Sequence, residues 1–512
     1  MKHAYRCWHD QINSKKKLIY KKKGISEMEK EKKVREKNRP SLLEALSMIA
    51  VLLGMIILAV QADISIIPAL VIAIVWSMAI AVKCGYSWDE IMKPILDRQR
   101  GVVEIFLIIL AIGMFVASMI YSGTIPTIIY YLINIISPNL MVVLSFIITA
   151  VVSCIIGTSW GTAGTVGVVM LSIAQSMGVP MAIVAGAVAS GSHVGQILSP
   201  MSDTSNVSAS LADVDTVTMI KRMAHYAIPV IIIASVVYAI LGFANTAVGG
   251  NLESAALIRQ EIAAVFNVNP LVILPMVFVF FLTFKKKPIL MTLTLTSLIG
   301  LIFGMIFNGF SFVNGLDALY NGFNLTGTVG IAENGFNDIF LNLVNRGGAM
   351  SMINAALLVI VATMYGTILL ETKAIDVIAV SIFGKVKSRP MLVTSSIFVS
   401  GLVVAMTSSS FLATMMSKDL FIEKFEKEGM DSMDLVSSCA TASTQFLTCI
   451  PWCDTAIFLA ALSGVSTLDA LPYNVFSWGC AAAAIGLSIF GIGFKNGKRF
   501  VDLTPVKAKV TE

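Results

Sequence analysis

Residues 157–167 read GTSWGTAGTVG, residues 191–206 read GSHVGQILSPMSDTSN, and an apolar run separates them. Gly, Ser and Thr crowd both ends of this hydrophobic region, and Asp203 follows Pro200, so we expect helices to break here at membrane depth. Broken backbone is tolerated at that depth only where protein or a water-filled cavity surrounds it. A carboxylate costs roughly 3 kcal/mol at the bilayer centre, so it usually faces the interior of a helix bundle. These two segments are therefore the leading candidates for a site.

The composition is that of a membrane protein. The 512 residues are 56% hydrophobic and only 13% charged, with a mean hydropathy of +0.82. Residues 1–40 hold fourteen Lys and Arg against five Asp and Glu, which is typical of a cytoplasmic tail under the positive-inside rule and not of a nucleic-acid-binding arm. The first apolar run begins after residue 40 and is long enough to span, so we expect no cleavable signal peptide. The seven cysteines lack metal-ligand spacing, and no cofactor is expected.

The two halves of the chain carry a matching motif. PMSDT at residues 200–204 and PWCDT at residues 451–455 share the pattern P-x-x-D-T, and each follows a Ser/Thr cluster. The charge bias of corresponding connections is opposite, because residues 122–139 contain no Lys or Arg whereas residues 373–389 contain four. Together these features predict two inverted-topology repeats.

The expected architecture is an all-α, polytopic membrane protein with 10–12 transmembrane segments, some of them broken or re-entrant. Residues 125–136, 166–177 and 180–189 are apolar but too short to span the bilayer. Both termini are expected in the cytoplasm, with the chain crossing the cell membrane many times. The predicted parts are a basic tail (1–40), two helices with an inner loop (41–101), a first repeat (102–245), connecting helices with an outer loop (246–348), a second repeat (349–494) and a C-terminal tail (495–512).

The broken segments offer ligands for a small cation. Asp203 and Asp454 can supply carboxylates, and helix breakage frees backbone carbonyls. Neutral oxygens can come from the hydroxyl groups of Thr158, Ser159, Ser202, Thr204 and Thr455. Burial raises the pKa of a carboxyl group and a nearby Na⁺ lowers it again, so H⁺ and Na⁺ would compete for one site. We expect Na⁺ at Asp203, with Asp454 as its counterpart.

Purely structural roles compete with these assignments. Gly157 and Gly161 have the GxxxG spacing of a helix-packing face. Asp203 and Asp454 could instead cap short helices, because Asp is a favoured N-cap residue. His193 is either a packing residue or a proton-sensitive group.

GTSWGTAGTVG, LSPMSDTSN and the later IPW with GVSTLDALPY resemble the NhaC family of Na⁺/H⁺ antiporters, within the ion transporter superfamily, over roughly residues 100–495. The resemblance implies a secondary antiporter with an inverted repeat that expels Na⁺, although some members exchange malate and lactate. The family often has acids upstream of IPW, yet residues 439–444 contain none. Gln196 stands where the family commonly has an acid, and Cys453 stands where it has Asn. The candidates for lining or coupling are Gly157, Trp160, Gly161, His193, Gln196, Pro200 and Pro451.

Two transport hypotheses follow. The first is Na⁺/H⁺ exchange by alternating access. The second is a coupled exchanger of organic acids or amino acids, in which Ser159, His193 and Gln196 read the substrate. A channel suits the paired acids at broken segments less well. No nucleophile, base and orienting group can be assembled from the motifs, so we expect no enzyme. The sequence leaves a homodimer open.

Overall fold

The computed structural model describes residues 39–62, 64–133, 137–245, 252–383, 386 and 388–489, and every regular element in these ranges is a helix. Eight of the described helices are long and apolar enough to cross a membrane, and the count reaches eleven if each of three bent pairs is one span. The predicted all-α, multi-pass membrane protein is therefore confirmed. The tails predicted at 1–40 and 495–512 lie outside the described residues, except for residues 39 and 40.

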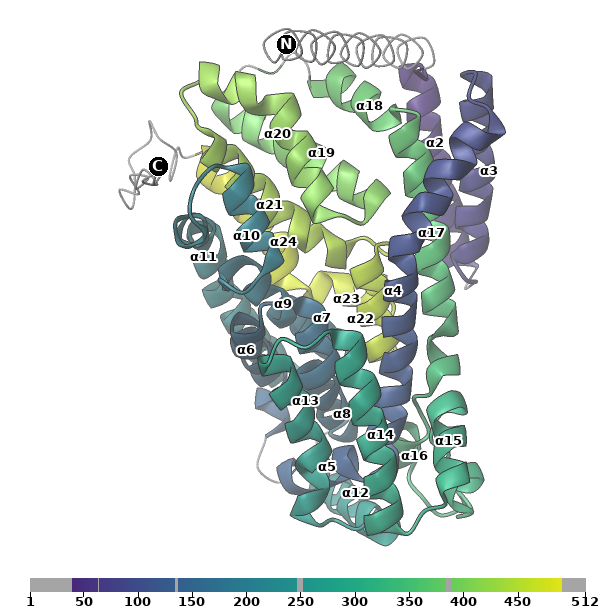
Figure 1. The fold of residues 1–512 in the computed structure, drawn as a ribbon. Coiled ribbons are helices and arrows are strands. Elements are labelled where there is room, and N and C mark those ends of the chain that lie inside the picture. The colour runs from purple at the N-terminus through teal and green to yellow at the C-terminus, as the bar shows by residue number, and fades with distance from the viewer. Residues whose placement is uncertain are drawn as a thin grey trace, which may run out of the picture. The chain divides into compact units, whose positions relative to one another are not determined.

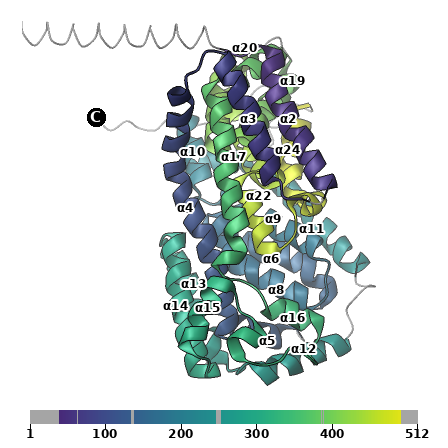
Figure 2. The same cartoon turned by 90° about the vertical axis from the view of Figure 1, so that its right-hand side faces the viewer.

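One compact unit comprises residues up to Ile95 together with Thr367–Ile382. Helices α2 (Leu42–Gln61) and α3 (Ile67–Lys83) pack side by side in it (Figure 2). Ser41 and Glu44 form a capping box at the start of α2, and an ion pair of 2.7 Å joins Glu44 to Lys83. The polar ends of these apolar helices are thus satisfied locally.

Helix α4 (Trp88–Tyr121) is longer than the sequence suggested. The predicted inner loop at 83–101 is mostly helical, because Ser87 and Glu90 exchange capping hydrogen bonds at the start of α4. Pro94 falls early in the helix and does not end it. Residues from Leu96 onward belong to the second unit.

The second unit begins its own helical bundle after α4. Its first half contains α5 (Thr124–Leu132), α6 (Pro138–Ile156), α7 (Ser159–Thr162), the π-helix η1 (Ala163–Gly167), α8 (Val168–Ser176), α9 (Met181–Leu198), α10 (Asp203–Leu211) and α11 (Thr216–Ala244). Helix α6 packs against both α9 and α11 (Figure 1). The short piece predicted at 180–189 is wrong, because α9 continues through the Gly- and Ser-rich segment to Leu198.

The middle of the chain is also helical. It contains α12 (Leu252–Val265), η3 (Pro270–Ile273), α13 (Leu274–Phe284), α14 (Ile289–Asn308), α15 (Phe312–Asn321), η4 (Leu325–Val329), α16 (Asp338–Val344) and η5 (Ala349–Met352). The predicted outer loop at 308–346 therefore holds three short helical elements. Asn side chains supply their N-terminal caps at Asn324 and Asn337.

The last part of the chain resembles the first half of the bundle. It contains α17 (Ile353–Glu371), α18 (Ala374–Phe383), α19 (Arg389–Thr407), α20 (Ser410–Lys427), α21 (Ser432–Cys449), α22 (Asp454–Ser463), α23 (Thr467–Ala470), η6 (Leu471–Tyr473) and α24 (Val475–Ile489). Helix α18 belongs to the first unit as far as Ile382.

The breaks between helices recur at a constant separation. Ser408 lies 251 positions after Gly157, and Gly429 lies 251 positions after Gly178; all four residues have positive φ angles. The two P-x-x-D-T motifs have the same separation, and each Asp begins a helix. The order of elements in residues 157–216 is thus repeated in residues 408–467. Opposite orientation of the two halves stays a prediction.

Candidate functional site

The two broken segments of the first half touch each other. Gly157 ends α6 in the left-handed conformation, with a φ angle of 84°. A Cβ atom at this position would lie 2.8 Å from the backbone carbonyl carbon of Met201, in the break between α9 and α10. Only glycine allows both the backbone conformation and this close approach. The sequence stretch that suggested a site therefore does converge.

Gln196 lies at the centre of this convergence. Its Nε2 donates to Ser159 Oγ at 2.6 Å, and its backbone carbonyl oxygen accepts from Ser202 Oγ at 2.7 Å. Thr204 Oγ1 donates to Gln196 Oε1 at 3.5 Å. Four of the predicted residues are thus joined in one hydrogen-bonded cluster around a neutral amide.

The glycine-rich turn after α6 is built by local hydrogen bonds. Thr158 is the N-cap of α7, and its Oγ1 accepts from the Gly161 backbone at 3.1 Å. A five-residue π-helix, η1, follows directly. Such departures from α-helical geometry are frequent at functional sites.

Of the two glycines with GxxxG spacing, Gly157 allows a close approach to Met201, whereas Gly161 does not face another helix closely. The nearest atoms to a Cβ at Gly161 belong to Thr158 and Ile156 of its own turn. Gly191 and Gly195 allow the close contact between α9 and α6, because a Cβ at Gly195 would overlap the carbonyl oxygen of Ser153 on α6. They have the small-xxx-small spacing that lets backbones approach closely.

The second half places its break between α21 and α22, whose axes differ by 44°. Asp454 begins α22, and its Oδ1 accepts from the Thr455 backbone at 2.6 Å and from Thr455 Oγ1 at 3.1 Å. Asp454 is partly buried, and Thr455 is buried. Pro451 lies in the turn between the end of α21 and the start of α22. Because Asp454 begins α22, its negative charge is favoured by the helix dipole.

Trp160 joins the two breaks. Its Nε1 donates to Thr455 Oγ1 at 3.2 Å, and its indole stacks on Phe458 of α22 with ring centroids 4.6 Å apart. Trp160, which follows the break at Gly157, thus contacts the start of α22, which follows the break at Pro451. Nothing in the sequence indicates this contact between Trp160 and the PWCDT motif.

Arg98 lies beside the second break and was not among the candidates predicted from the sequence. It is partly buried on α4, and its Nη2 donates to the carbonyl oxygen of Thr407 at the end of α19 at 2.6 Å. Its positive charge also interacts electrostatically with Asp454. In the sequence, Arg98 lies among other basic residues, which is typical of an inner loop.

Asp203 differs from the expectation of a desolvated carboxylate. Its side chain is exposed, although it begins α10 as Asp454 begins α22. Neither residue is an N-cap: Ser202 caps α10 and accepts from the Ser205 backbone, and Cys453 occupies the cap position of α22. Pro200 lies in the exposed turn before Asp203. The two acids are first-turn residues with unequal exposure.

His193 is fully buried on α9. Its Nδ1 lies 3.0 Å from the Ala189 carbonyl oxygen, and Ser192 Oγ lies 3.2 Å from the same nitrogen. The packing role is thus present, and the ring nitrogen Nε2 is left for other contacts.

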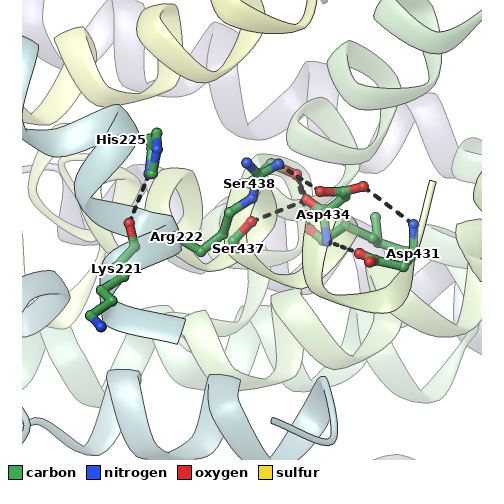
Figure 3. A network of polar contacts seen from close by, with 8 residues as sticks. Lys221, Arg222, His225, Asp431, Asp434, Ser437 and Ser438 are labelled. Atoms are coloured by element: carbon green, nitrogen blue, oxygen red, sulfur yellow. Dashed lines mark hydrogen bonds and ion pairs between the residues drawn. The ribbon is translucent and has the colours of Figure 1, made fainter. Parts of the chain in front are cut away.

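A buried ion pair connects the two halves away from the breaks (Figure 3). Arg222 Nη2 of α11 lies 2.6 Å from Asp434 Oδ1 of α21, and the two side chains are only 5% and 3% exposed. The Asp434 backbone carbonyl oxygen accepts from Ser438 Oγ at 3.0 Å, and Asp431 caps the helix. The pair cannot be seen in the sequence, because Arg222 and Asp434 lie 212 positions apart.

Comparison with known proteins gives consistent matches. The model of the Na⁺/H⁺ antiporter family matches residues 194–492, and that of the C4-dicarboxylate anaerobic carriers matches residues 3–243. The malate-2H⁺/Na⁺-lactate antiporter of Bacillus subtilis is 27% identical, over 88% of this chain and 94% of its own. The Na⁺/H⁺ antiporter NhaC of Alkalihalophilus pseudofirmus is 28% identical, over 88% of this chain and 95% of its own. The arginine/ornithine antiporter ArcD of Halobacterium salinarum is 30% identical, over 76% and 79%.

Proposed function

The chain belongs to the Na⁺/H⁺ antiporter family, and we propose that it is a secondary transporter that exchanges Na⁺ for H⁺ by alternating access, with Asp454 as the carboxylate that binds either ion. The observation that carries this assignment is the position of Asp454. It is a partly buried acid at a helix break, beside the buried hydroxyl of Thr455 and the indole of Trp160. Acids held inside a membrane bundle usually mark ion paths.

The chemistry of Asp454 suits a monovalent cation. Its carboxylate and the carbonyl groups freed between α21 and α22 are hard oxygen ligands. Among the residues that the structure describes, no group of three or more His, Cys, Asp or Glu side chains could hold a metal ion. In the proposed site, Asp454 is the carboxylate that meets the ion. Between binding events, the positive charge of Arg98 partly compensates Asp454. Na⁺ and H⁺ then compete for a single negative charge.

Asp203 is the proposed counterpart in the first repeat. The constant separation of 251 positions supports an internal repeat, and inverted repeats carry paired sites that change access in turn. We assign the exposure of Asp203 and the partial burial of Asp454 to one conformation of that cycle. Thr158, Ser202 and Thr204 would supply neutral oxygens on the Asp203 side. Cytoplasmic termini and a homodimer remain part of the proposal.

The test is a pH-gradient dye assay on everted membrane vesicles, with Na⁺, Li⁺ or K⁺ added in turn. We expect Na⁺ to dissipate the gradient in the wild type, Asp454→Asn to abolish this response, and Asp203→Asn to reduce it. Asp317→Asn on α15 is the control, because Asp317 is exposed and accepts a hydrogen bond from Asn321 in the same helix. Wild-type exchange by correctly inserted Asp454→Asn protein would rule the assignment out.

Gln196 favours a second candidate, a Na⁺- or H⁺-coupled exchanger of organic acids or amino acids. A neutral amide that hydrogen-bonds Ser159 and Thr204 can read a polar solute but adds no charge for a cation. The names of two relatives, the malate/lactate and arginine/ornithine antiporters, point the same way. In the vesicle assay, a response that needs added malate, lactate or arginine would select this function.

A further inference from the structure

Four buried polar atoms on α9 and α21 have no hydrogen-bond partner within the described residues, and one of them, Ser432 Oγ, lies at the very start of α21. The other three are His193 Nε2, Thr441 Oγ1 and Gln445 Nε2, and all three side chains are fully buried. Buried polar groups in native proteins are nearly always paired, because an unpaired one costs about 1–3 kcal/mol. A group of such atoms inside a transporter therefore points to a ligand.

A chain of hydrogen bonds ties α9 to α21 beside these atoms. Ser190 Oγ donates to Asn474 Oδ1 at 2.9 Å, and Asn474 Nδ2 donates to Thr448 Oγ1 at 2.8 Å. Thr448 Oγ1 donates to Ser477 Oγ at 2.9 Å, and Ser477 Oγ donates to Gln445 Oε1 at 2.9 Å. The chain fixes Ser190 of α9 relative to Thr448 and Gln445 of α21.

The three residues with unpaired atoms lie on this hydrogen-bonded chain or one helical turn away from it. His193 lies three positions after Ser190 on α9, so the two side chains share a face. On α21, Gln445 and Thr441 lie four positions apart and also share a face. Helices α9 and α21 contact each other directly. The three atoms therefore belong to neighbouring faces of two packed helices.

The hydrogen-bonding capacity of this group, which combines an acceptor with donors, suits a carboxyl group that carries a proton. The Gln445 amide oxygen already accepts from Ser477, which leaves the NH₂ group with hydrogens to donate. The Ala189 carbonyl can only accept, so His193 Nδ1 carries a hydrogen and Nε2 presents a lone pair. The lone pair of His193 Nε2 can accept the proton of a carboxyl group, while the Gln445 amide and the Thr441 hydroxyl donate to its oxygens. The proton is then shared between a carboxyl oxygen and Nε2.

We propose that His193, Thr441 and Gln445 form a binding site for the carboxyl group of a small organic acid or amino acid, taken up together with one proton. Gln445 and Thr441 donate to the carboxyl oxygens, and His193 Nε2 holds the proton. No covalent bond forms or breaks other than the transfer of that proton. The site is separate from Asp454. The inference rests on the organic-substrate alternative above, and it can fail without affecting cation exchange.

The experiment measures ligand binding by the purified full-length protein, using thermal stabilisation and equilibrium binding with L-lactate, L-malate, L-alanine and L-arginine. We expect at least one of them to bind the wild type and the Asp317→Asn control protein alike. His193→Asn keeps a donor near the Nδ1 position for the Ala189 carbonyl but removes Nε2, and Gln445→Leu removes the NH₂ group. Each variant should raise the Kd by roughly tenfold or more, because a hydrogen bond to a charged group is lost.

The outcomes separate the two proposals. Loss of carboxylate binding in His193→Asn with Na⁺-driven proton movement retained supports the site independently of the cation assignment. Preference for lactate and malate identifies a hydroxy-acid substrate, whereas preference for alanine or arginine identifies an amino acid. Absence of binding of all four acids to the wild type, or unchanged binding in a monodisperse His193→Asn protein, would overturn the inference.

Discussion

The ion pair between Arg222 and Asp434 should stabilise the packing of α11 on α21. Replacing Asp434 by Asn leaves the guanidinium of Arg222 buried, with its side chain 5% exposed, and removes the carboxylate that it pairs with. Removing one partner of such a pair typically costs about 3–5 kcal/mol. Because Asn retains the size of the side chain, the loss reports the charge and not a cavity. The matched control is the double variant Arg222→Met with Asp434→Leu, which removes both charges and should recover most of the stability.

The assay is equilibrium unfolding of the purified protein by SDS in mixed micelles, followed by tryptophan fluorescence. We expect Asp434→Asn to unfold at a clearly lower SDS fraction than the wild type, and the double variant to return close to it. Two results would refute the reasoning. One is wild-type stability in Asp434→Asn, and the other is a double variant as unstable as the single one.

Three further substitutions test the helix junctions. Gly195→Leu should prevent close packing of α6 and α9, because even a Cβ would overlap the Ser153 carbonyl oxygen; we expect loss of folded protein on size-exclusion chromatography. Gly157→Ala should cost about 1–2 kcal/mol from its φ angle of 84°, measured by the same SDS titration. Asp215→Ala should cost about 1 kcal/mol by removing the cap of α11. Hydrogen bonds from Thr218 lower the pKa of Asp215. The cap is therefore present above the ordinary pKa of 3.8 and lost as the pH falls through the lowered value, which acid titration of wild type against variant would reveal.

The helical, multi-pass fold could be predicted because composition and apolar run length determine it. The length of single helices was harder to predict. Gly191 and Gly195 looked like helix breakers, yet they remain helical because α6 approaches closely there. Ser87 and Glu90 carry an S-x-x-E capping signature that would have placed the start of α4 correctly.

The site was predictable where a motif signalled a backbone break, and unpredictable where long-range packing chose the contacts. Ser159 and Gln196 were both candidates, and the structure joins them. Arg98 could not be assigned, because its contact with Thr407 spans more than three hundred positions. Asp203 and Asp454 occupy equivalent positions in their motifs, so sequence alone could not show that they differ in exposure.

The two halves share their backbone breaks more closely than the side chains around them. At the separation of 251 positions, Trp160 corresponds to Phe411, and Gln196 corresponds to Leu447. His193 corresponds to a threonine in the second half. Matched breaks give both halves equivalent hinges, which alternating access requires. In the proposed sites, the unmatched side chains would give the solute different contacts in each half. A substitution at a matched break should therefore slow every transport reaction of the protein, whereas one at Gln196 or His193 should change which solute is carried.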